Sequence, residues 1–82
     1  MSKQVKTTLQ QVSCDRRGHP RAFCFRAKKV TVEKILDDWE EAGCWWQGER
    51  PRRVYKLLGD SGAVYEIHHQ APLGWHLHRL YD

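Results

Sequence analysis

Three histidines are the residues in this sequence best suited by type to coordinate a metal ion. His68, His76 and His78 lie in two neighbouring segments rich in β-forming residues, and Glu66 lies two positions before the first of them. Imidazole and carboxylate groups are common zinc ligands, and two adjacent strands can supply ligands to one ion. The spacing matches no metal-binding motif, however, and histidines on the solvent side of a sheet are ordinary. Two interpretations stay open, a metal site and a polar sheet face.

A second group of candidates lies in the basic and aromatic segment WWQGERPRRVYK, residues 45–56. Arginines can hold phosphates while aromatic rings stack on bases, which is how small barrels bind single-stranded nucleic acid. The candidate binding residues are Trp45, Trp46, Arg50, Arg52, Arg53 and Tyr55. In the alternative interpretation, the tryptophans fill a small core and the arginines solvate an edge strand.

Catalytic motifs are absent from the sequence. Cys14, Cys24 and Cys44 have no CxxC spacing and no nucleophile signature nearby, which favours buried or idle thiols in a reducing compartment. Neither a glycine-rich phosphate loop nor a paired-carboxylate motif occurs. We therefore expect a non-enzymatic protein without a cofactor. We also expect a cytoplasmic location and no membrane contact, because no apolar signal segment or spanning run is present.

Length and charge narrow the class of protein only a little. A chain of 82 residues makes one small domain with a modest core. The formal net charge of +4, with 14 lysines and arginines, permits contact with nucleic acid or an acidic partner without demanding either.

The elements that would position these residues are mostly strands. Residues 1–14 are polar and predict a tail or an edge strand, and residues 15–82 predict a single β domain. Residues 21–32 predict a hairpin with Phe23 and Phe25 on one face, connected by a short Ala27-Lys28 link.

Residues 31–42 support two predictions. Their apolar side chains recur at helical spacing, at Val32, Ile35, Leu36 and Trp39. Against a helix, Lys34 would lie in its first turn and two glutamates in its last turn, opposite to the charges that the helix dipole favours. A short helix and irregular strand structure both remain open.

The two C-terminal hairpins can be predicted down to their register. The sequence Gly59-Asp60-Ser61-Gly62 suits a type I turn with Gly62 as a left-handed bulge residue, which pairs Gly59 with Ala63. The partners that follow are Tyr55 with Ile67, Leu57 with Tyr65, and Lys56 with Glu66. In the next hairpin, they are His69 with Trp75, Ile67 with Leu77, His68 with His76, and Glu66 with His78.

Together these patterns predict a mainly β fold. We expect a small antiparallel meander of five or six strands curled into a partial barrel, with one short helix around residues 31–42 as the open alternative. The predicted core residues are Phe23, Phe25, Trp39, Trp45, Tyr65, Ile67, Trp75 and Leu77.

Several short motifs occur in an order that resembles a bacterial family. They are GHPRAFCFRAKKVTV, ILDDW, WWQGE, RRVYKL, DSGAVYEI and GWHLHRLYD. This order resembles the DUF6504-type small proteins and is similar to the C-terminal extension of ImuB, a catalytically inactive polymerase-like protein of the bacterial mutagenesis cassette. The resemblance covers the chain from about Val5 to Asp82, and Ala27 departs from it where the family usually has glycine.

The resemblance implies a compact β module tied to bacterial DNA damage tolerance or translesion synthesis. It implies action by binding partners such as replication or repair polymerase subunits. The residues on the family's pattern are Trp45, Trp46, Arg53, Tyr55, Trp75, Leu77 and His78. A protein-interaction module is therefore the leading hypothesis, with single-stranded nucleic-acid binding and metal binding as alternatives.

Overall fold

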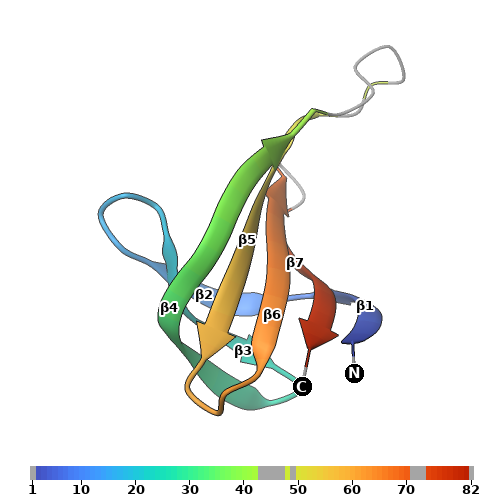
Figure 1. Cartoon of the computed structure of the whole chain (residues 1–82). Coiled ribbons are helices and arrows are strands. Elements are labelled where there is room, and N and C mark those ends of the chain that lie inside the picture. Colours follow the sequence, from blue (N-terminus) through green and yellow to red (C-terminus); the bar gives the residue numbers. More distant parts are fainter. Residues whose placement is uncertain (1, 43–47, 49, 71–73, 82) are drawn as a thin grey trace.

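In the part of the chain that the structure describes, seven antiparallel strands form one meandering sheet that curls into a nearly closed barrel (Figure 1). The structure is a computed structural model that describes residues 2–42, 48, 50–70 and 74–81. The strands are β1 (Ser2–Thr8), β2 (Gln10–Cys14), β3 (Pro20–Phe25), β4 (Lys28–Glu41), β5 (Arg52–Gly59), β6 (Val64–Gln70) and β7 (Gly74–Tyr81). This confirms the predicted antiparallel meander, with seven strands in place of five or six. The described part of the chain contains no helix long and apolar enough to cross a membrane.

The N-terminal residues connect the two ends of the sheet. The strand order is β1-β7-β6-β5-β4-β3-β2, so β1 pairs with the last strand of the chain and β2 pairs with β3. Only Leu9 separates β1 from β2, and its amide donates a hydrogen bond of 2.9 Å to the carbonyl of Trp75. One almost continuous polar segment thereby brings the sheet close to closure.

Residues 31–42, for which a short helix was the open alternative, form most of the long strand β4. Two irregularities in its pairing with β5 leave Glu33 and Leu36 as extra residues. A bulge of this kind reverses the inward and outward alternation of a strand. Val32 and Ile35 therefore both face the core although they are three positions apart. The apparent helical spacing comes from these bulges, and the helix prediction is wrong.

The predicted register of β5 and β6 is confirmed. Tyr55 pairs with Ile67, and Leu57 pairs with Tyr65. The Gly59 amide donates to the Ala63 carbonyl at 2.8 Å, and Gly62 has a φ of +89°. The turn chemistry therefore determined the register.

The pairing of β6 with β7 follows the prediction only in part. His69 pairs with Trp75, and His68 pairs with His76. A shift after Leu77 then pairs Glu66 with Arg79, so the predicted pair of Glu66 with His78 is wrong. His78 is the extra residue at this bulge, which no turn signal in the sequence marked.

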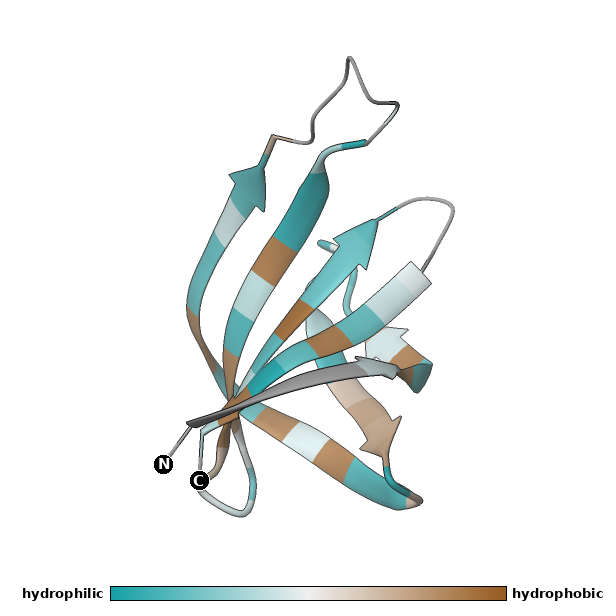
Figure 2. Ribbon diagram, turned by 90° about the vertical axis from the view of Figure 1, so that its right-hand side faces the viewer, coloured by the Kyte–Doolittle hydropathy of each residue, from teal (hydrophilic) through white to brown (hydrophobic). Residues whose placement is uncertain are grey.

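The core lies inside the barrel, and Figure 2 shows hydrophobic residues alternating with hydrophilic ones along the strands that enclose it. Its buried members are Leu9, Phe23, Phe25, Val30, Val32, Tyr55, Leu57, Tyr65, Ile67 and Leu77. Of the other predicted core residues, Trp75 is half-buried against this cluster. Trp39 is half-buried but pairs with Val54 on the opposite face of the sheet, because the bulge at Leu36 reverses the alternation. Trp45 lies outside the described residues.

The hairpin between β3 and β4 turns at Arg26 and Ala27, and Lys28 already belongs to β4. Both turn residues have positive φ, +52° and +63°. Positive φ at both central positions is the type I′ arrangement that suits the twist of a two-residue hairpin. The turn thus adopts a conformation that favours glycine, although the chain has alanine there.

Candidate functional site

The candidate arginines of β5 are divided between the two faces of the sheet. Arg53 is on the inner face with Tyr55, whereas Arg52 is on the outer face with Val54. This division follows from the alternation of side chains along a strand. Each guanidinium is half-exposed and already bound to a carboxylate, Arg52 to Glu41 and Arg53 to Asp38. The structure does not gather these arginines into a single basic patch.

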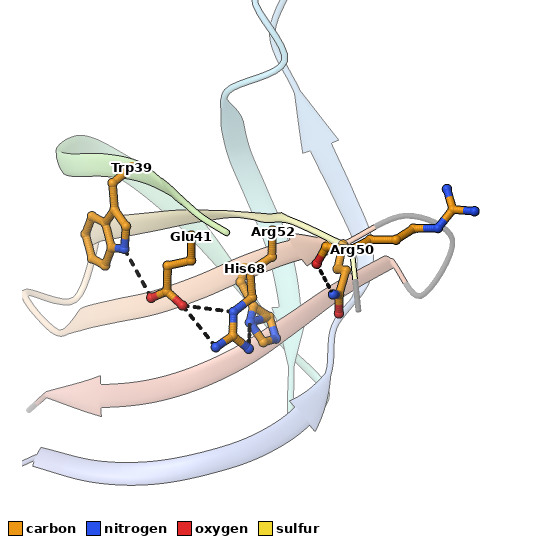
Figure 3. A network of polar contacts seen from close by, with 6 residues as sticks. Trp39, Glu41, Arg50, Arg52 and His68 are labelled. Atoms are coloured by element: carbon orange, nitrogen blue, oxygen red, sulfur yellow. Dashed lines mark hydrogen bonds and ion pairs between the residues drawn. The ribbon is translucent and has the colours of Figure 1, made fainter. Parts of the chain in front are cut away.

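The outer face carries a polar network built on strands β4, β5 and β6 (Figure 3). The carboxylate of Glu41 accepts hydrogen bonds from the indole of Trp39 at 3.2 Å and from Nε of Arg52 at 3.0 Å. The Trp39 hydrogen bond first, and then Arg52, lower the pKa of Glu41. One guanidinium nitrogen of Arg52 also lies 3.5 Å from Nδ1 of His68.

The three candidate metal ligands are neighbours beside this network. The ring centroid of His68 lies 5.3 Å from that of His76 and 5.9 Å from that of His78. Burial, together with the charges of Arg52 and the other two histidines, lowers the pKa of His68 to about 4. Within the described residues, no group of three metal-ligating side chains is arranged to hold an ion. With this lowered pKa, His68 is neutral at neutral pH.

The other predicted binding residues lie outside the polar network and the histidine cluster. Arg50 is exposed, and its side chain points away from the outer-face network in Figure 3. Its backbone carbonyl accepts a hydrogen bond of 2.6 Å from the side-chain amide of Gln70. Trp45 and Trp46 lie outside the described residues.

The inner face carries a feature that sequence patterns did not reveal. Four rings form a continuous series, which we call the aromatic row: His19, Tyr55, Trp75 and His69. Successive ring centroids are 6.0, 5.7 and 4.7 Å apart. Tyr55 is buried and the other three residues are half-buried. Tyr55, His69 and Trp75 come from the three neighbouring strands β5, β6 and β7, and the curl of the barrel adds His19 from the turn before β3.

Both charge and burial act on the centre of the aromatic row. The guanidinium carbon of Arg53 lies 5.9 Å from the centroid of the Tyr55 ring, within the range of a cation–π contact. Burial raises the pKa of the Tyr55 hydroxyl, and Asp38 raises it further, although Arg53 opposes them. Tyr55 therefore stays neutral and serves as a support for the half-exposed rings beside it.

The turn between β2 and β3 adds a group of arginines that the site prediction missed. It projects from the side of the barrel in Figure 1 and lines an open pocket of about 330 Å³. The lining residues are Asp15, Arg16, Arg17, His19 and Arg21. A signal for it exists in the sequence, because the cluster Asp15-Arg16-Arg17-Gly18 is typical of a turn and carries two adjacent arginines.

These features define the protein as a small all-β barrel with an aromatic inner row, a polar outer face and a basic turn. The chain belongs to the family described as "Domain of unknown function (DUF6504)", whose model matches residues 2–81. No curated protein matches the chain, and no solved structure matches it.

Proposed function

We propose that this domain is a non-enzymatic binding module that holds single-stranded nucleic acid across the aromatic row. The observation that carries the proposal is the continuity of four rings across the inner face, at centroid separations of 4.7 to 6.0 Å. Small barrels bind single strands by stacking bases on such rings, and each stacked base contributes roughly 1–3 kcal/mol.

The exposed parts of the row suit this role. Trp75 and His69 are both half-buried, so part of each residue is open to solvent, and their ring centroids are 4.7 Å apart. Arg53 lies over Tyr55 at the same end of the sheet and is half-exposed. Burial and the nearby Asp15 raise the pKa of the Cys14 thiol, which makes a nucleophilic thiolate less available at that position.

The proposal is tested by replacing one tryptophan on each face of the sheet. Trp75→Leu keeps an apolar side chain against the core but removes the stacking ring, so affinity for a single-stranded oligonucleotide should fall about tenfold. Trp39→Leu removes a tryptophan from the outer face and should leave affinity unchanged. Fluorescence anisotropy with a labelled oligonucleotide gives both affinities, and circular dichroism melting checks that each variant is folded. Equal losses in the two variants would argue against the aromatic row.

A second candidate function is protein binding, favoured by Leu36. Leu36 is 43% exposed, the one large hydrophobic residue that is exposed among those the structure describes, and it lies beside exposed Asp37 in β4. The likeness to the ImuB extension supports a partner among bacterial replication or repair polymerase subunits.

Affinity capture with purified polymerase subunits tests this second function. Leu36→Ser should reduce recovery of a bound subunit several-fold, because it removes apolar area from the contact. Lys29→Ser changes another exposed residue of β4 and should leave the recovery of the subunit unchanged. Recovery that is equal for the parent and both variants would exclude Leu36 as a contact.

A further inference from the structure

We propose that the turn between β2 and β3 is a phosphate subsite for the backbone of a single strand lying across the aromatic row. This inference rests on the function proposed above. It concerns the open pocket of about 330 Å³ whose lining includes Arg16, Arg17 and Arg21.

Asp15 gives this turn a defined shape. One of its carboxylate oxygens accepts hydrogen bonds from the amides of Arg17 at 2.9 Å and His19 at 3.0 Å. The other oxygen forms an ion pair of 3.2 Å with Arg21. The His19 amide makes the largest contribution to lowering the pKa of Asp15, so the carboxylate stays ionised and its acceptor sites are used within the turn.

The charge of the pocket remains positive after this pairing. Three guanidinium groups and one carboxylate line it, which leaves an excess of two positive charges when His19 is neutral. Arg16 and Arg17 are exposed, and neither takes part in an ion pair among the residues that the structure describes. Guanidinium groups that are free of carboxylates are the preferred partners of phosphate oxygens.

His19 joins this pocket to the aromatic row. His19 is one of the residues that line the pocket, and its ring centroid lies 6.0 Å from that of Tyr55. In a single strand, the phosphates and the bases project from opposite sides of the sugars. A strand with bases on the row can therefore place phosphates in the pocket. The arginines and the rings form one surface that suits a nucleic acid with accessible bases more than a duplex or a phosphorylated peptide.

The test compares two pairs of charge-removing substitutions. The arginine pair, Arg16→Gln with Arg17→Gln, removes two exposed charges from the turn. The control is the lysine pair, Lys28→Gln with Lys29→Gln, which removes two exposed charges from the hairpin at the other end of β3. Binding of an oligothymidine of about 12 nucleotides is measured by fluorescence anisotropy over a series of salt concentrations. The arginine pair should weaken binding about tenfold near 50 mM salt. It should also reduce the slope of the logarithm of the binding constant against the logarithm of the salt concentration by about 1.4, the value for two phosphates on a single strand. The lysine pair should keep the parent's slope.

The possible outcomes separate this inference from the proposed function. If the parent binds the oligonucleotide and both pairs have equal slopes, the phosphate subsite is wrong and binding by the aromatic row stands. If the parent does not bind, the proposed function is wrong, and an NMR titration with inorganic phosphate then decides whether the turn binds anions. Saturable shifts of the Arg17 and His19 amides that vanish in the arginine variant would support a phosphate site, and unmoved amides would overturn it.

Discussion

Gly59 occupies a position in the core where a side chain has no room. A β-carbon built there would lie 2.8 Å from Cε2 of Tyr65 and 3.2 Å from Cγ1 of Val30. Both neighbours are buried, so they cannot move into solvent. The glycine therefore lets the end of β5 approach the aromatic core.

We predict that Gly59→Ala destabilises the domain by about 1–3 kcal/mol, because the extra methyl group overpacks the core. Urea denaturation followed by tryptophan fluorescence measures the loss. Ser61→Ala, in the exposed part of the same turn, should change the free energy of unfolding by less than about 0.5 kcal/mol. A Gly59→Ala variant as stable as the parent would show that Tyr65 has space to shift.

A second residue-scale prediction concerns His68 and acid. Its pKa is about 4 in the folded protein and near 6.5 when unfolded, so the unfolded chain binds the proton more tightly. The stabilising contribution of neutral His68 is complete above the unfolded pKa and is lost as the pH falls towards 4. Because His68 is half-buried and screened by solvent, we expect the loss to be about 1–2 kcal/mol.

The measurement is urea denaturation at about pH 7.5 and about pH 4.5. His68→Gln should show a smaller loss of stability at the lower pH than the parent. His69→Gln, on the opposite face and with His68 intact, should show the parent's loss. Identical pH dependence in all three proteins would contradict the assignment to His68.

At the scale of elements, the turn between β3 and β4 holds two residues in an unfavourable conformation. Arg26 and Ala27 both have positive φ, which is strained for residues with a β-carbon. Ala27→Gly should stabilise the domain by about 0.5–1 kcal/mol, since glycine adopts this conformation without the steric cost. Thermal melting measures the gain. Lys28→Gly, one position into β4, should instead destabilise the domain, and a loss in both variants would mean that Ala27 is not strained.

The turn between β5 and β6 and the bulges of the sheet differ in how clearly the sequence marks them. The register of β5 with β6 could be predicted because two glycines flank a turn whose geometry fixes the pairing of Gly59 with Ala63. The bulges at Glu33, Leu36 and His78 could not be predicted, because none of these residue types marks an extra position in a strand. The two bulges in β4 made this strand resemble a helix, and the bulge at His78 moved Glu66 away from His78.

At the scale of the whole molecule, the candidate site was less predictable than the fold. Side-chain alternation alone places Arg52 and Arg53 on opposite faces, so this division can be predicted from the sequence. The contact of His19 with Tyr55 joins a turn to a strand more than thirty residues away, and it depends on how far the barrel curls. Nothing local in the sequence encodes that curvature.

The pairing of β1 with β7 has a mechanical consequence. Ser2 lies opposite Tyr81, so the two ends of the described chain leave the barrel side by side (Figure 1). A force that separates these ends would act along the hydrogen bonds between the two strands, because those bonds lie across the strands. The bonds would then break one after another, which is the unzipping geometry. A force applied between Ser2 and Gly74, at opposite ends of the two strands, would instead load the whole ladder at once. Pulled through its own ends, the domain should therefore yield at low force, with β1 leaving the barrel first.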